Sequence, residues 1–128
     1  MLEKLLDLAN KSYIPYSKYR VATILVMKDG KEISGVNVEN ASYGASICSE
    51  RNAITTAIAM GYKKGDFKRI YIMVSGDKLS MPCFMCRQVI TEFFDKDASL
   101  YFYSSKGDIQ EFKVYQLCPY PFNEDDLD

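Results

Sequence analysis

Two short stretches carry residue types that could bind a metal ion. Residues 48–51 read CSER, and residues 82–86 read PCFMC, with two cysteines three positions apart. On a helix, positions i and i+3 lie on one face, so Cys83 and Cys86 can share one ion. Backbone N–H groups and the helix dipole at a helix start favour thiolates. If Cys48 converges on the same point, three thiolates with one open position make the arrangement of a catalytic zinc.

Glu50 and Arg51 are the residues that favour chemistry at such a site. A carboxylate two residues from a metal-binding cysteine can reach the ion's water without being a ligand. The alternative for Glu50 is an acidic first-turn residue that complements the helix dipole. Zinc with three thiolates carries a net negative charge. An arginine that donates hydrogen bonds to a ligand sulfur would partly neutralise this charge. The alternative for Arg51 is an ordinary surface arginine.

The cysteines also allow two other interpretations. The pair Cys83 and Cys86 could be a redox couple, or Cys118 could close a four-cysteine structural site. Cys118 lies in the apolar context LCP, where a buried thiol behaves as a small hydrophobic residue. This context argues against the closed site.

Composition limits the classes of function. The 128 residues carry a net charge of −1, which gives no electrostatic reason to expect a nucleic-acid partner. The chain contains no histidine, so imidazole catalysis and histidine-liganded zinc are excluded. The N-terminus has no apolar signal segment and no stretch approaches a membrane span, so we expect a cytoplasmic protein with no membrane partner. At this length we expect a single domain covering residues 1–128.

The elements that position these residues follow from apolar periodicity and turn signals. We expect helices over residues 2–12, 48–60 and 82–94, the second apolar on most faces and the third with Pro82 at its first position. Strands are expected over residues 21–27, 32–38, 70–74, 100–103 and 109–114, the first two joined as a hairpin at Asp29-Gly30. This order predicts an α/β fold, a three-layer α/β/α sandwich with a mixed five-stranded sheet.

The motifs also resemble those of a known family. Cys-x-Glu followed by Pro-Cys-x-x-Cys is the three-cysteine form of the zinc deaminase signature. Five blocks resemble the small homotetrameric zinc-dependent cytidine deaminases in the same order: PYSKYRV (15–21), NVENASYG (37–44), CSERNAI (48–54), PCFMCRQV (82–89) and LCPYPFNEDDL (117–127). The resemblance covers nearly the whole chain and implies a cytidine deaminase-like domain.

The resemblance implies a reaction and its residues. Cys48, Cys83 and Cys86 would hold one Zn²⁺ per chain. Glu50 would shuttle protons from the zinc-activated water to the cytosine ring and the leaving amine. Cytidine and deoxycytidine would become uridine and deoxyuridine with release of ammonia, as in pyrimidine salvage. The backbone N–H of Ser49 would bind the carbonyl oxygen of the base, and Arg51 would act on the ligand sulfur.

The nucleoside contacts implied by the resemblance come from further along the chain. Asn37 and Glu39, two apart at a strand end, resemble the pair that holds the ribose 3′-hydroxyl. Tyr19 stands where the family has a base-stacking phenylalanine. Phe122 and Tyr43 would reach a neighbouring subunit's site, which implies a homotetramer with shared active sites acting on a free nucleoside.

The sequence departs from the family pattern at several positions. The family commonly has alanine where Ser49 stands, and small residues where Phe84 and Met85 stand. The usual glycine after Val21 is Ala22, followed by Thr23, which would affect packing near Tyr19. None of these changes removes a reacting group. Two competing hypotheses remain open from the sequence: a deaminase of another aminated pyrimidine, such as a nucleoside antibiotic or an RNA base, and a non-catalytic zinc-stabilised binding module.

Overall fold

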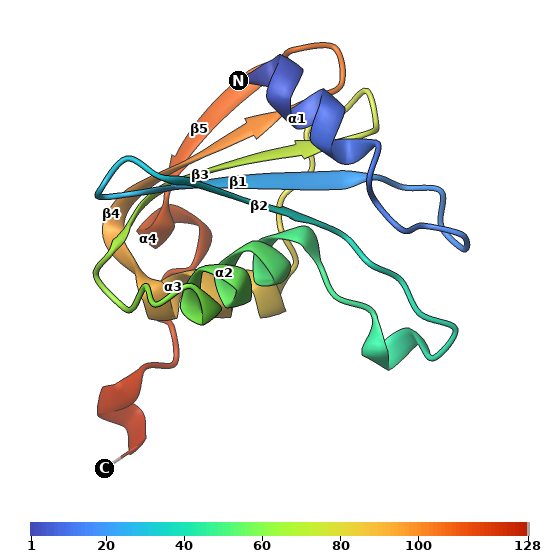
Figure 1. Ribbon diagram of the computed structural model, residues 1–128. Helices are drawn as coiled ribbons and strands as arrows, with labels where there is room; N and C mark the ends of the chain where they lie inside the picture. The colour runs from blue at the N-terminus through green and yellow to red at the C-terminus, as the bar shows by residue number, and fades with distance from the viewer. Residues whose placement is uncertain (128) are drawn as a thin grey trace.

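Five runs rich in β-branched and aromatic residues form one sheet in the computed structural model, which describes residues 1–127 (Figure 1). The strands are β1 (Val21–Met27), β2 (Glu32–Val36), β3 (Phe67–Val74), β4 (Phe94–Tyr103) and β5 (Ile109–Lys113). Their order across the sheet is β2-β1-β3-β4-β5. The expected mixed five-stranded sheet is therefore confirmed.

The directions of the strands follow from their connections. β1 and β2 form the expected antiparallel hairpin, and β1 is also antiparallel to β3. β3 and β4 are parallel, because a helix crosses over between them. β5 returns antiparallel to β4.

Helices cover both faces of the sheet, as Figure 1 shows. α1 (Leu2–Ala9) lies on one face, and α2 (Ser49–Ala59) and α3 (Phe84–Phe93) lie on the other. A short helix, α4 (Val114–Leu117), follows β5 on the side of α2 and α3. The three-layer α/β/α arrangement expected from the sequence is confirmed.

Alternation along β1 divides the apolar residues between two cores. Ala22 and Ile24 pack with Leu5 of α1, whereas Leu25 and Met27 pack in the larger core with α2 and α3. Thr23 shares the face of Leu25 by the period-2 rule and is fully buried there. A hydroxyl group is thus placed under the start of α2.

Gly35 allows α2 to lie directly on β2. A Cβ atom at this position would lie 2.5 Å from the backbone oxygen of Ser49 and 2.5 Å from the backbone nitrogen of Ala53. Real Cβ contacts are not this short, so only glycine permits the approach. The close packing fixes where the first turn of α2 lies relative to the sheet.

Several expected boundaries are wrong. The first helix ends at Ala9 instead of residue 12, and the second strand ends at Val36 instead of residue 38. The third helix begins at Phe84 with Cys83 as N-cap, so Pro82 precedes the helix. β3 and β4 begin earlier than expected, at Phe67 and Phe94.

The expectation that the second helix is apolar on most faces is also wrong. α2 buries one face, with Ala53, Ile54 and Ala57 in the core, while Ile58 and the C-cap residue Met60 are exposed.

Within residues 1–127, no helix is long and apolar enough to cross a lipid bilayer.

Candidate metal centre and active site

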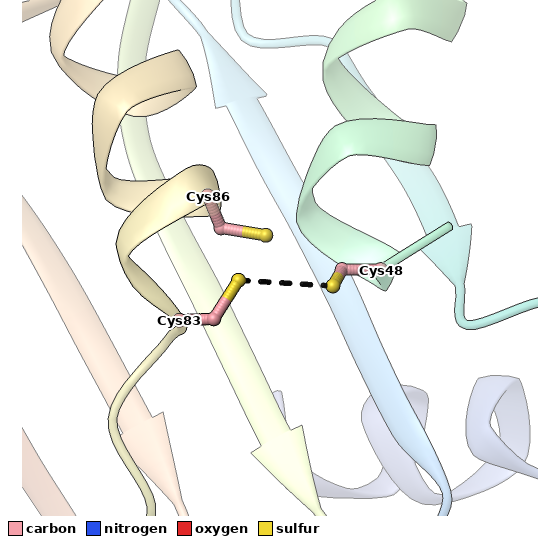
Figure 2. A group of neighbouring side chains, drawn as sticks. All are labelled: Cys48, Cys83 and Cys86. Carbon is pink, nitrogen blue, oxygen red and sulfur yellow. Dashed lines mark hydrogen bonds between the residues drawn. The ribbon is translucent and has the colours of Figure 1, made fainter. Parts of the chain in front are cut away.

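Three cysteines from two helix starts converge beside the sheet (Figure 2). Cys48 is the N-cap of α2, Cys83 is the N-cap of α3, and Cys86 lies one turn into α3. Their sulfur atoms all lie within 4.8 Å of one another, and the Sγ atoms of Cys48 and Cys83 are 4.0 Å apart. The convergence of two helix N-termini expected from the sequence is confirmed.

The chemistry of this donor set fits zinc. Hydrogen bonds from Cys86, Arg51 and Cys83, of which the one from Cys86 has the largest effect, together outweigh burial and lower the pKa of the Cys48 thiol to about 5. The same contact with Cys48 and burial raise the pKa of Cys86. A thiolate beside two further sulfurs is a soft cation site, and three sulfurs leave a tetrahedral ion one open position. Cys118 lies outside this cluster, so the chain as described from residue 1 to 127 forms no closed four-cysteine site.

Arg51 lies where a residue that tunes the ligand charge would lie. Its Nη2 atom donates a hydrogen bond to Cys48 Sγ at 3.8 Å, and this contact raises the pKa of the guanidinium. Its Nε atom is buried and has no hydrogen-bond partner among the described residues. Arg51 is thus partly buried and in contact with a cysteine sulfur, and its tuning role stays a prediction.

Glu50 is buried next to the cysteines. Its side chain is 4% exposed, and burial raises its pKa, as does the charge of Cys48, while a hydrogen bond from Ser49 acts in the opposite direction. The Ser49 Oγ atom donates to Glu50 Oε1 at 2.7 Å. A carboxyl group with a raised pKa can hold a proton nearer neutral pH than an exposed one, which suits a proton carrier.

A cavity of about 300 Å³ opens at the cysteines and Glu50. Six of the predicted site residues line this cavity: Tyr19, Asn37, Cys48, Ser49, Glu50 and Cys83. Apolar side chains from β1 and β3 and residues 80–82 complete the wall. The volume suits a small molecule and the lining combines an apolar body with a few polar groups.

Tyr19 and Asn37 form one side of the cavity. The Tyr19 hydroxyl donates to Ser80 Oγ at 3.2 Å. The Asn37 side chain donates to the Tyr19 carbonyl at 2.8 Å and accepts from the Val21 N–H at 3.0 Å, so it holds the entry to β1. One amide N–H and one oxygen lone pair of Asn37 remain for a ligand.

Glu39, Tyr43 and Phe122 do not reach this cavity. Glu39 Oε1 accepts the backbone N–H groups of Tyr16 and Ser17, both at 3.1 Å. Glu39 and Tyr43 instead line a neighbouring hollow of about 350 Å³. Tyr43 is 77% exposed and Phe122 is 57% exposed. The chain by itself therefore brings together the cysteines, Glu50, Tyr19, Asn37 and Ser49, and leaves these three outside.

The sequence did not indicate that Thr23 belongs to the site. Its hydroxyl lies 2.7 Å from Ser49 Oγ, which in turn donates to Glu50 Oε1. The signal that could have found it is a single hydroxyl residue within the apolar strand VATILVM.

Comparison with known proteins places this geometry in context. The sequence model for the cytidine and deoxycytidylate deaminase zinc-binding region matches residues 1–102. The cytidine deaminase of Halalkalibacterium halodurans is 36% identical over 127 residues, covering 99% of this chain and 95% of the relative. A probable cytidine deaminase of Dictyostelium discoideum is 40% identical over 133 residues, covering 98% of this chain and 86% of the relative. The crystal structure of cytidine deaminase from Burkholderia pseudomallei superimposes with a TM-score of 0.90 at 36% identity, covering 94% of this chain and 95% of that one.

Proposed function

Because the chain belongs to the zinc-dependent cytidine deaminase family, we propose that its cavity carries out the hydrolytic deamination of free cytidine and deoxycytidine in pyrimidine salvage. The chain is an enzyme that deaminates cytidine, and it carries one zinc ion. The proposal concerns the residues, the reaction steps and the assembly. The observation that supports it best is the cluster of three convergent cysteine sulfurs, two of whose residues line one cavity together with the buried Glu50.

Cys48, Cys83 and Cys86 would hold the zinc. When bound, zinc lowers the pKa of a coordinated water towards neutrality and so supplies a nucleophile at neutral pH. Arg51 donates to Cys48 Sγ and limits the negative charge that three thiolates place at the site.

Glu50 moves the protons of the reaction. A carboxylate oxygen accepts one proton of the attacking water and delivers it to ring nitrogen N3, as the water oxygen bonds to carbon C4. Glu50 then passes the second proton of that oxygen to the amine, and the carbon–nitrogen bond breaks to release ammonia. The atoms balance, because one water enters and one ammonia leaves.

The remaining cavity residues orient the nucleoside. The Ser49 N–H binds the carbonyl oxygen of the base and Tyr19 stacks on the ring. The spare amide N–H of Asn37 binds a ribose hydroxyl group inside the cavity. The second carboxylate oxygen of Glu39, which lines the other hollow, would bind the ribose from outside this cavity. These contacts favour a free nucleoside over a base within a polynucleotide.

Phe122 and Tyr43 complete the site of a neighbouring subunit in a homotetramer. Both side chains are exposed, and the segments that carry them project from opposite sides of the body in Figure 1. A cytoplasmic, single-domain catalytic unit of residues 1–128 is part of the same proposal.

The substitution Glu50→Gln tests the proposed chemistry. The variant keeps the shape of the side chain and the zinc ligands but cannot accept a proton, so we expect one zinc per chain and a loss of kcat of at least about a hundredfold. The matched control is Glu92→Gln on the exposed side of α3, which we expect to retain wild-type turnover. Measured by the absorbance change of cytidine, full activity of Glu50→Gln would refute the mechanism.

A further inference from the structure

Two buried hydroxyl groups lie behind Glu50 in an unbroken chain of hydrogen bonds. Thr23 and Ser49 are both 0% exposed. Thr23 Oγ1 lies 2.7 Å from Ser49 Oγ, and Ser49 Oγ lies 2.7 Å from Glu50 Oε1. Both contacts have the length of strong O–H···O bonds. The reaction steps described above do not use either hydroxyl.

The number of protons fixes the direction of this chain. A serine hydroxyl has one proton to donate, and a carboxylate can only accept. Since Ser49 donates its proton to Glu50 Oε1, the bond between Thr23 and Ser49 must be donated by Thr23. The chain therefore runs from Thr23 to Ser49 to Glu50, with every donor pointing towards the carboxylate.

The two hydroxyl groups stand on rigid parts of the molecule. Thr23 lies on β1, which is hydrogen-bonded on both sides by β2 and β3. Ser49 is the first residue of α2, and its backbone is held against β2 at Gly35. The hydrogen bonds thus fix the Glu50 carboxylate relative to β1, a central strand of the sheet, and not relative to solvent.

We propose that Ser49 and Thr23 are positioning residues that hold Oε1 of Glu50 in place, so that Oε2 is the oxygen that receives and delivers protons. Among the side-chain hydrogen bonds of residues 1–127, Oε2 takes part in none, whereas Oε1 is occupied by Ser49. This inference rests on the proposed role of Glu50. It gives the Ser49 side chain a function that its backbone N–H does not share.

The test removes each hydroxyl without removing a backbone group. Ser49→Ala should lower kcat by about tenfold, since a hydrogen bond to a charged group is lost, while KM changes by less than about twofold. Thr23→Val keeps the shape of the side chain and should lower kcat by about threefold with the same unchanged KM. Thr23→Ser keeps the hydroxyl and should restore kcat relative to Thr23→Val. Zinc content should stay at one ion per chain in all three variants.

The double variant distinguishes two cases. In the first, which we call the relay, Thr23 acts on Glu50 only through Ser49. In the second, the two hydroxyl groups act independently. Thr23 acts only through Ser49, so adding Thr23→Val to Ser49→Ala should cause no further loss of kcat. Losses that multiply in the double variant would overturn the relay. Wild-type kcat in Ser49→Ala, with Glu50→Gln inactive, would also overturn it and leave the proposed function intact, whereas an active Glu50→Gln would refute the proposed function itself. If Ser49→Ala does not fold, the Thr23→Val and Thr23→Ser pair decides, because equal kcat in these two would overturn the relay.

Discussion

Glu50 works in surroundings that push its proton affinity upwards from two sides. Burial raises its pKa, and the negative charge at Cys48 raises it again, while the Ser49 hydroxyl counteracts both. Such a balance lets a carboxylate hold and release a proton near neutral pH, which is the task that imidazole performs in many other enzymes. A chain with no histidine can therefore carry out proton transfer through one buried glutamate.

The hydrogen bond from Arg51 to Cys48 leads to a prediction about the pKa of the Cys48 thiol. In the zinc-free protein, the pKa of Cys48 is lowered to about 5, so this residue is a thiolate above that pH and a thiol below it. Arg51 donates to its sulfur, so Arg51→Gln should raise the pKa of Cys48 and shift its reaction with iodoacetamide to higher pH. The rate of Cys48 alkylation as a function of pH, followed by mass spectrometry, measures this shift.

Arg51→Lys is the matched control for this prediction. Lysine keeps the positive charge but presents no planar fork to the sulfur, so its curve should lie between those of the wild type and Arg51→Gln. Coincident curves for all three proteins would show that Arg51 does not stabilise the thiolate.

At the residue scale, the sequence identified the groups whose chemistry is local. Cys48, Glu50 and the pair Cys83 and Cys86 stand out because their types and spacing suffice to suggest a metal site. The hydroxyl of Thr23 could not be found in this way, because it meets Ser49 only when β1 passes beneath α2. Asn37 was named through the family resemblance, but its hydrogen bonds to the Tyr19 and Val21 backbone, 16 to 18 positions away in sequence, could not be found from local spacing.

At the scale of elements, types were predictable and ends were not. Periodicity identified the five strands and the three principal helices. The sequence predicts Pro82 as the first residue of a helix, but Cys83 is the N-cap with an extended backbone, and its Sγ atom lies 4.0 Å from that of Cys48. The start of α3 therefore differs by two residues from the one expected from Pro82, whereas the bounds of α2 differ from those expected only by its two cap residues.

Gly35 is the element-scale test of that packing. A methyl group there would meet the backbone of α2 at 2.5 Å, and backbone atoms cannot rotate away. Gly35→Ala should therefore push α2 off β2, lower the free energy of unfolding by about 1–3 kcal/mol and reduce zinc content through displacement of Cys48. Chemical denaturation and metal analysis measure the two effects.

Gly44→Ala is the control for this substitution. A Cβ atom at Gly44 meets no atom within 4 Å, so stability and zinc content should stay near those of the wild type. Equal stability of the two variants would show that α2 tolerates displacement from β2.

At the scale of the whole molecule, the proposed site is larger than one chain. The cavity supplies zinc ligands, Glu50 and one aromatic wall, whereas Phe122 lies outside it on the C-terminal segment that projects from the body (Figure 1). An exposed aromatic side chain on a projecting segment suits insertion into a partner's site. Sequence resemblance suggested this role, and the position of Phe122 outside its own cavity is consistent with it.

Mixing one impaired and one inactive variant tests whether sites are shared. Phe122→Ala should lower kcat/KM by about tenfold or more through lost stacking on the base, and Glu50→Gln should be inactive. If one subunit supplies Phe122 to a neighbour's Glu50, random refolding of the two variants together should restore about a quarter of the sites to wild-type composition. Activity should then exceed the mean of the two parents.

The control is a mixture of Phe122→Ala with the double variant Glu50→Gln/Phe122→Ala, which can form no complete site and should show no gain. If the first mixture also shows only the mean of its parents, while sedimentation confirms mixed oligomers, Phe122 serves its own chain and the shared-site tetramer is refuted.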